Sequence, residues 1–262
     1  MKVCLLTSGS IGNVVVVEDK TESILIDCGV TFKKFSELIS QTDLKVEKIK
    51  NILITHEHSD HIKGVGVTTR KLNLQMWATE KTANMMYEKG ILKETDKKVE
   101  YVEKYQTYEI AGFKITPFPL SHDAVDPVGY IIERNGKKIV WLTDTGYVSK
   151  EVRSAVQGAH LYIMEMNHNV DMLLSSSRPW LLKQRILSDF GHLSNEDGAY
   201  AFSQIMTNQT QHVFLAHISK EANLVEVAMK AMKDILKQEN IDASKLRIYE
   251  TYPLRPSRVV EL

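Results

Sequence analysis

Cysteine is scarce in this sequence of 262 residues, which contains only Cys4 and Cys28. Both lie in apolar runs that are typical of strands, so we expect buried, reduced thiols rather than a disulfide or a metal site. Scarce cysteine fits a reducing compartment, and we expect a cytoplasmic protein. No apolar run approaches the length of a membrane span, and no cleavage site follows Met1–Leu6, so we expect neither a membrane anchor nor a signal peptide.

An excess of charge of either sign is also absent, because 33 basic residues balance 33 acidic ones. Proteins that coat nucleic acid non-specifically are usually more basic, so any contact with nucleic acid must come from a local patch. Low-complexity linkers and repeats of fixed length are absent as well. We therefore expect a single domain over residues 1–262, with a core that needs no disulfides.

Short apolar runs alternate with segments of helical periodicity in both halves of the chain. This mixture predicts an α/β fold in which two mixed sheets pack face to face with helices outside. The predicted strands are Val3–Leu6, Val14–Glu18, Ser23–Asp27, Asn51–Thr55, Met76–Ala78, Val99–Val102, Gln106–Ile110, Phe113–Phe118, Val128–Arg134, Lys138–Thr143, His212–Ala216, Leu246–Tyr249 and a last one after Pro256. The predicted helices are Thr31–Ile39, Ile62–Leu72, Glu80–Lys89, Ser149–Val156, Asn195–Met206 and Leu224–Gln238.

Three of the nine histidines fall in the segment His56-Glu57-His58-Ser59-Asp60-His61, directly after the predicted strand Asn51–Thr55. Residues two apart in extended chain point to the same side, so His56 and His58 can reach one point. A mixture of imidazole and carboxylate ligands suits zinc, and manganese also accepts it. The histidine spacing differs from that of the helical His-Glu-x-x-His motif. We therefore predict a metal site that begins where a strand ends.

Three further ligand candidates close other strand-like runs: His122, Asp144 and His217. Alone, each is more often a packed or solvated residue, and Asp144 before Thr145-Gly146 is also typical of a turn. Strand ends converge at one edge of a sheet, so together these residues supply enough ligands for two divalent metal ions.

These segments resemble the metallo-β-lactamase superfamily over nearly the whole chain. The motifs that carry the resemblance are Ile24-Leu25-Ile26-Asp27-Cys28-Gly29, the cluster at 56–61, Leu120-Ser121-His122, Leu142-Thr143-Asp144-Thr145-Gly146 and Leu215-Ala216-His217. The resemblance implies a four-layer αββα sandwich with two metals at the sheet edges. The implied ligands are His56, His58 and His122 for one ion, Asp60, His61 and His217 for the other, Asp144 as the bridge, and Asp27 as a residue that orients them.

The C-terminal half resembles the phosphodiesterase branch of that superfamily, notably ribonuclease Z. The segment Gly191-His192-Leu193-Ser194 precedes a predicted helix, and the resemblance implies that His192 acts on the scissile phosphate, paired with Glu165. Phosphodiester hydrolysis needs a proton donor at the leaving oxygen, which favours this role. The alternative for His192 is a helix-entry residue without chemistry, with Ser194 or Asn195 as the N-cap.

Over its whole length the chain is similar to the YycJ/WalJ family of metallo-hydrolases, regarded as 5′-to-3′ double-stranded DNA exonucleases. The resemblance rests on Thr7-Ser8-Gly9-Ser10-Ile11-Gly12-Asn13, Glu165-Met166-Asn167-His168, the segment 178–189 and Gly191-His192-Leu193-Ser194-Asn195-Glu196-Asp197. In one place the chain departs from the family pattern, since Asn169 stands where an aspartate is usual. The substrate implied by the family is nucleic acid, most simply DNA.

From these motifs we expect Asp60 to orient the attacking water, while His192 stabilises a phosphate oxygen or protonates the leaving group. The glycine-rich loop at 8–13 is typical of an anion-binding nest, and equally of a plain hairpin turn. The basic stretch around Trp180 suits a nucleic-acid backbone, and equally a solvated helix face with a buried Trp180. The predicted phosphate contacts are Ser10, Asn13, Asn167, His168, Arg178, Lys183, Arg185 and Ser194.

Other functions compete with a DNA exonuclease. One is a ribonuclease of the tRNA-processing type, and another is a hydrolase of cyclic nucleotides, other small phosphodiesters, thioesters or lactones. A metal-dependent structural module is disfavoured by the complete ligand set. An oxygen-reducing diiron protein is disfavoured because it normally has a carboxylate where this chain has His58. The oligomeric state is not predictable from the sequence.

Overall fold

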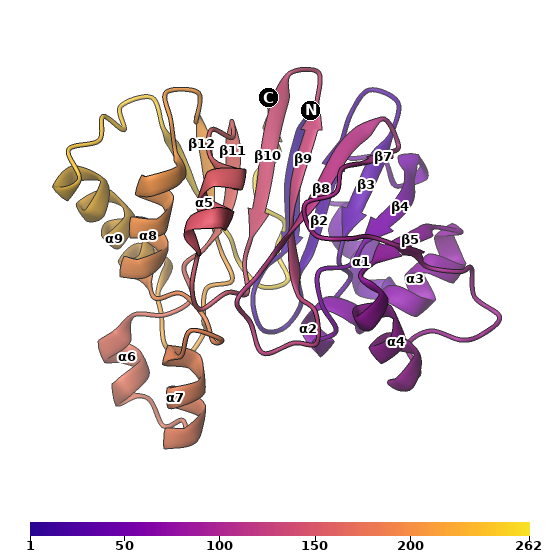
Figure 1. Cartoon of the computed structure of the whole chain (residues 1–262), viewed down its shortest axis with the longest axis horizontal. Coiled ribbons are helices and arrows are strands. Elements are labelled where there is room, and N and C mark those ends of the chain that lie inside the picture. Colours follow the sequence, from indigo (N-terminus) through magenta and orange to yellow (C-terminus); the bar gives the residue numbers. More distant parts are fainter.

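The strand β2 (Val14–Glu18) is buried along its whole length, as a strand requires when both faces of its sheet are covered. Its alternate side chains enter two different cores. Val15 and Val17 pack between the sheets, whereas Val14 and Val16 pack under helices. The same division occurs in the second half of the chain, and it produces four layers (Figure 1).

The computed structural model describes residues 1–262, which form two seven-stranded sheets. The first sheet has the order β14 (Val260–Glu261), β1 (Lys2–Thr7), β2, β3 (Ser23–Ile26), β4 (Ile49–Leu53), β5 (Gln75–Ala78) and β6 (Glu100–Tyr101). The second has the order β13 (Arg247–Glu250), β12 (His212–Ala216), β11 (Leu161–Glu165), β10 (Lys137–Leu142), β9 (Val128–Arg134), β8 (Phe113–Pro119) and β7 (Tyr108–Ile110). Both sheets are mixed, with β3 to β6 parallel in the first and β10 to β13 parallel in the second.

Helices cover the outer face of each sheet (Figure 1). The first sheet carries α1 (Phe32–Ile39), α2 (Ser59–Ile62), α3 (Val65–Leu72) and α4 (Glu80–Glu88). The second carries α5 (Lys150–Val156), α8 (Asn195–Ile205) and α9 (Val225–Gln238), while α6 (Val170–Ser175) and α7 (Trp180–Leu187) project beside it. No helix has both the length and the apolar character that crossing a bilayer requires.

Two features of the chain differ from the sequence predictions. The helix predicted over Ile62–Leu72 is two helices, because the Gly64 N–H donates to the Cys28 carbonyl where the chain turns between them. The strand β11 and the pair α6–α7 were not predicted. β11 is buried throughout and so lacks the alternation that marks a half-exposed strand.

Candidate metal centre

Several strands of the sandwich end at one edge, where they bring distant parts of the sequence together. His56 and His58 follow β4, His122 follows β8, Asp144 follows β10, and His217 follows β12. The short helix α2 begins immediately after His58 and places Asp60 and His61 beside them. The structure therefore gathers all seven predicted metal ligands at this edge, and together these residues form the ligand cluster.

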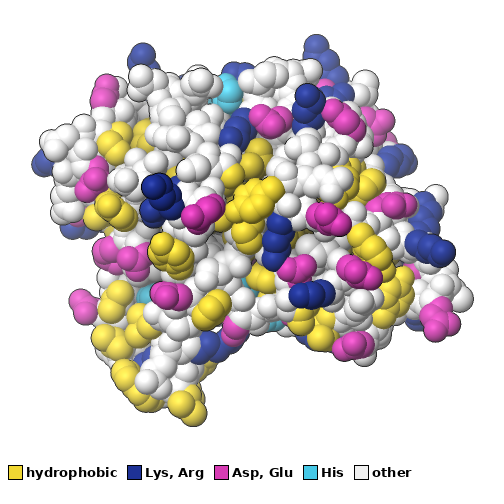
Figure 2. All heavy atoms as spheres, in the orientation of Figure 1, with side chains coloured by type: hydrophobic (Ala, Val, Ile, Leu, Met, Phe, Trp, Pro, Cys, Tyr) yellow, Lys and Arg dark blue, Asp and Glu magenta, His cyan; other side chains and the backbone are white.

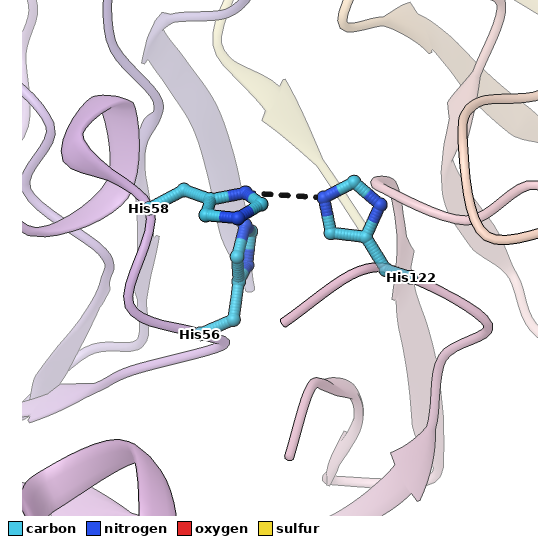
Figure 3. Close-up of side chains that lie close together, drawn as sticks. All are labelled: His56, His58 and His122. Carbon is cyan, nitrogen blue, oxygen red and sulfur yellow. Dashed lines mark hydrogen bonds between the residues drawn. The ribbon is translucent and has the colours of Figure 1, made fainter. Parts of the chain in front are cut away.

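The side chains of His56, His58 and His122 point toward one another (Figure 3). Their closest ring nitrogens all lie within 4.8 Å, and Nε2 of His122 is 3.2 Å from Nδ1 of His58. Nε2 of His56 is buried without any hydrogen-bond partner. Three imidazole nitrogens that converge in this way form one candidate metal position.

A second group lies next to the first and contains Asp60, His61 and His217. Asp144 stands between the two groups. Its Oδ2 is 3.4 Å from Nε2 of His61, its Oδ1 is 3.3 Å from Nε2 of His217, and it also groups with His56. Both oxygens thus lie near the second group, and the grouping with His56 brings the same carboxylate within reach of the first, which suits a bridging position between two ions.

Hydrogen bonds on the outer side of the rings turn the other ring nitrogens into the ligand cluster, where Nε2 of His56 and Nε2 of His217 have no hydrogen-bond partner. Nδ1 of His61 donates to Asp27 at 2.7 Å, and Nδ1 of His122 donates to the Gly191 carbonyl at 3.0 Å. In His217, Nδ1 donates to Glu165 at 3.1 Å, and Nε2 has no hydrogen-bond partner although it is buried. Each ring is thereby held as the tautomer that a metal ligand requires.

The charges of the ligand cluster also favour a bound cation. Burial disfavours a charged His217, yet Asp144 and the other neighbouring carboxylates raise its pKa to about 10. Burial lowers the pKa of His56 well below its ordinary value, which keeps that ring neutral. The donor set, the free inward nitrogens and the concentration of carboxylates fit two divalent ions, and this fold implies such ions.

Glu165, the last residue of β11, joins the ligand cluster to the predicted proton donor. Its Oε1 accepts hydrogen bonds from Nδ1 of His192 at 2.7 Å and from Nδ1 of His217 at 3.1 Å. Its Oε2 accepts from the Thr145 N–H at 2.9 Å, next to Asp144. Burial would raise the pKa of Glu165, but His192 outweighs it and brings the pKa to about 2. The carboxylate is therefore charged and fixes both rings.

Three non-glycine residues at this edge have left-handed backbone conformations. They are Asp27, Asp144 and His217, with φ of 55°, 61° and 56°. Such conformations are uncommon outside glycine, and they recur where a binding site determines the backbone. Each follows a strand of the sandwich and turns its side chain into or against the ligand cluster.

Two residues of the loop before β2, Ser8 and Asn13, support the ligand cluster. The Asn13 amide is buried and donates to Asp60 Oδ2 at 3.3 Å and to the Gly9 carbonyl. This placement contradicts the prediction that Asn13 contacts phosphate. Ser8, which was not predicted, accepts a hydrogen bond from the His217 N–H at 2.8 Å. No sequence signal separates Ser8 from an ordinary loop serine.

A cleft of about 320 Å³ opens onto the ligand cluster. Its lining includes Ser10, Asn167, Arg178, Arg185 and His192, whose contacts with the substrate stay a prediction. The other lining residues are His58, Asp60, Asp144, Leu182, Ile186, His217, Ser219 and Glu221.

The two arginines of the cleft have carboxylate partners. Arg178 pairs with Glu221 at 3.0 Å, and Arg185 pairs through two nitrogens with Asp123. Asn167 donates to the His217 carbonyl at 2.9 Å, so it also anchors a predicted ligand.

Three other predicted phosphate contacts lie elsewhere. The Lys183 ammonium is buried and donates to the carbonyls of Leu174 and Ser176, where it closes the end of α6. The Ser194 hydroxyl is the N-cap of α8 and accepts from the Asp197 N–H. The His168 ring is buried and lies outside the lining of the cleft. These placements contradict the predicted phosphate contacts.

The structure also places two residues that the sequence left open. Asn169, the departure from the family pattern, is the N-cap of α6 and accepts from the Met172 N–H. Trp180 is 60% exposed, which excludes the alternative of a helix face with a buried Trp180.

A model of the β-lactamase superfamily domain matches residues 22–218 of the chain. The sequence is 37% identical over 257 residues to exodeoxyribonuclease YycJ of Bacillus anthracis, with 97% of each chain covered. It is 41% identical over 263 residues to exodeoxyribonuclease WalJ of Streptococcus pneumoniae, with 100% of this chain and 98% of that protein covered.

Solved structures share the fold at low identity. The metallo-β-lactamase-fold protein YhfI from Bacillus subtilis gives a TM-score of 0.75 at 16% identity, with 100% of this chain and 99% of YhfI covered. The short form of human tRNase Z gives 0.63 at 18% identity, with 84% and 93% covered. The predicted αββα sandwich is confirmed, and the chain belongs to the metallo-β-lactamase superfamily and, within it, to the family of the YycJ and WalJ exodeoxyribonucleases.

Proposed function

We propose that this protein is a metal-dependent phosphodiesterase that removes nucleotides from the end of double-stranded DNA. The observation that carries the proposal is the hydrogen bond between His192 and Glu165, which places a proton donor against the ligand cluster. The sequence similarity to two curated exodeoxyribonucleases, which extends over nearly the whole chain, supports DNA as the substrate.

We assign the metal ligands from the geometry of the ligand cluster. His56, His58 and His122 would hold one ion, Asp60, His61 and His217 would hold the second, and Asp144 would be shared between them. Five imidazoles and two carboxylates suit zinc, and the carboxylates also admit manganese. Bound ions supply Lewis acidity, which lowers the pKa of water and offsets the negative charge of the phosphate.

The side chains of the cleft divide the remaining work of hydrolysis. Asp60 accepts a hydrogen bond from the attacking water and so orients it. His192 donates a hydrogen bond from Nδ1 to Glu165, which leaves Nε2 to hold a phosphate oxygen or to protonate the leaving oxygen. The Glu165 carboxylate thereby fixes the orientation of the His192 ring.

Arg178, Arg185 and Ser10 are placed to bind the phosphates of the substrate strand. The two arginines pair with Glu221 and Asp123 on the protein surface. Such exposed pairs contribute only about 0–1 kcal/mol, so a phosphate can displace either carboxylate at little cost.

The proposal is tested with end-labelled double-stranded DNA and each of manganese, magnesium and zinc. We expect nucleotides to be released progressively from one end, and 5′ and 3′ labels to report the polarity. His192→Ala should lower kcat by about 100-fold or more while the metal content stays unchanged. The matched control is His160→Ala, because His160 lies at the far end of β11. Loss of metal from His192→Ala would instead make His192 a ligand.

A small phosphodiester is the second candidate substrate, and the modest volume of the cleft favours it. The same assay therefore includes bis-p-nitrophenyl phosphate, a cyclic nucleotide and an RNA duplex. Cleavage of the small esters alone would overturn the exonuclease proposal, and preferential cleavage of RNA would make the protein a ribonuclease.

A further inference from the structure

Phe190 is a large apolar side chain two residues before His192, which lines the cleft, and 61% of its surface is exposed. Apolar side chains on a surface need no explanation when they are scattered singly. Leu181, on α7, is also exposed, to 79%, and stands one helical turn from Arg185, which lines the cleft. Figure 2 shows that apolar side chains also gather on the projecting pair α6–α7.

The backbone around Phe190 is fixed to a loop that carries a metal ligand. The Phe190 carbonyl accepts from the Asp123 N–H at 3.1 Å, and the Asp189 carbonyl accepts from the Ser121 hydroxyl at 2.7 Å. One residue further on, the Gly191 carbonyl accepts from Nδ1 of His122 at 3.0 Å. These bonds flank Phe190 on both sides, so its ring is presented to solvent from a well-ordered backbone.

The neighbours of Phe190 define what can cover it. His192 follows it by two residues, and Asp123, to which its carbonyl is bound, holds Arg185. A ligand that lies on the ring therefore has a basic group and the proton donor beside it. A planar apolar group attached to a phosphodiester matches this surface, and a nucleobase of a DNA strand is such a group. Aromatic side chains bind bases by stacking, whatever the base.

We propose that Phe190 stacks on the base of the nucleotide next to the scissile phosphate. This proposal rests on the proposed function and adds the residue that grips the substrate base. It gives the cleft a way to hold DNA without a basic surface, which agrees with the neutral net charge of the chain.

The test combines a change in the protein with a change in the substrate. Wild type and Phe190→Ala are compared on a DNA duplex and on the same duplex with an abasic nucleotide at the cleaved position. Stacking predicts that Phe190→Ala raises KM about ten-fold or more on normal DNA and leaves cleavage of the abasic duplex unchanged. Phe190→Trp should retain the wild-type KM on normal DNA, while Phe190→Leu should raise KM almost as much as Phe190→Ala does.

Tyr200→Ala is the matched control, since Tyr200 is an exposed aromatic residue on α8 outside the cleft. If Phe190→Ala raises KM equally on both duplexes, Phe190 only holds its loop, and the stacking proposal is overturned. Sedimentation in which wild type self-associates and Phe190→Ala does not would assign the surface to a second copy of this chain, and would also overturn it. If wild type cleaves neither duplex, the proposed function itself fails.

Discussion

Glu165 is the residue on which the site depends most at the scale of single side chains. One carboxylate oxygen holds both His192 and His217, and the other holds the backbone beside Asp144. A carboxylate can accept all of these bonds, whereas an amide of the same shape accepts on one atom only.

We therefore expect Glu165→Gln to lower cleavage by about 10- to 100-fold, with a smaller loss of bound metal. The measurements are kcat on the DNA duplex and metal content after dialysis. Glu133→Gln, at a half-buried glutamate of β9, is the control. Full activity in Glu165→Gln would mean that His192 needs no charged partner.

Gly29 permits the close approach of two loops at the ligand cluster. A Cβ at this position would lie 1.6 Å from the Asp60 carbonyl oxygen, which is backbone and cannot turn aside. We expect Gly29→Ala to displace Asp60, and to reduce both metal content and kcat. Gly136→Ala meets no atom within 4 Å but places alanine at a φ of +72°, so it should lower stability and leave the metal content intact. Equal metal content in both variants would contradict this account.

At this scale the sequence predicted the ligand cluster well, because closely spaced histidines after a strand are a local signal. Contacts made by single polar residues were harder to predict. Lys183 and Ser194 look like phosphate contacts in the sequence, and the structure shows both bound to ends of helices. Such partners depend on tertiary structure, which residue type alone does not reveal.

At the scale of elements, α6 and α7 are the part of the structure that the sequence predicted least. Both helices are short, and the stretch has little clear apolar periodicity. Short helices are marginal alone and are stabilised by tertiary contacts. Strands with clear boundaries, such as β9 and β10 on either side of Asn135-Gly136, were predicted closely because the turn is coded locally.

Lys183 joins these two helices, so its removal should loosen them. In Lys183→Met the carbonyls of Leu174 and Ser176 lose a charged donor, and we expect α6–α7 to be destabilised by about 1–3 kcal/mol. Hydrogen exchange over residues 170–190 should quicken while the two sheets keep their protection. Lys233→Met, at an exposed lysine of α9, is the control. A weaker affinity for DNA with unchanged exchange would restore Lys183 as a phosphate contact.

At the scale of the whole molecule, the two sheets meet at a cluster of buried carboxylates. Asp27, Asp144 and Glu165 are all buried there, and Asp60 lies beside them. Their mutual repulsion opposes folding unless cations offset it. The strands that carry these carboxylates lie far apart along the chain, so the sequence could predict this convergence only from ligand candidates at strand ends and from the family resemblance.

Removal of metal should therefore destabilise the entire protein. A ligand present at about 100 times its Kd adds about 2.7 kcal/mol to the free energy of unfolding. For a chain of this size, each kcal/mol shifts Tm by about 2–4 °C. We expect chelation to lower the Tm of wild type by several degrees and that of Asp144→Asn by much less, since the variant binds less metal and has lost one buried charge. Scanning calorimetry with and without chelator measures both. An identical Tm in all four samples would show that folding and metal binding are independent.

The left-handed backbone at Asp27, Asp144 and His217 has a consequence for the engineering of this protein. Glycine at any of these positions would relieve backbone strain of about 1–3 kcal/mol, so a search for heat-resistant variants would reward their replacement. The same replacements would delete side chains that we propose to hold or orient the metal ions. Selection for thermal resistance alone would thus erase activity first, and a library meant to preserve both should hold these three codons constant.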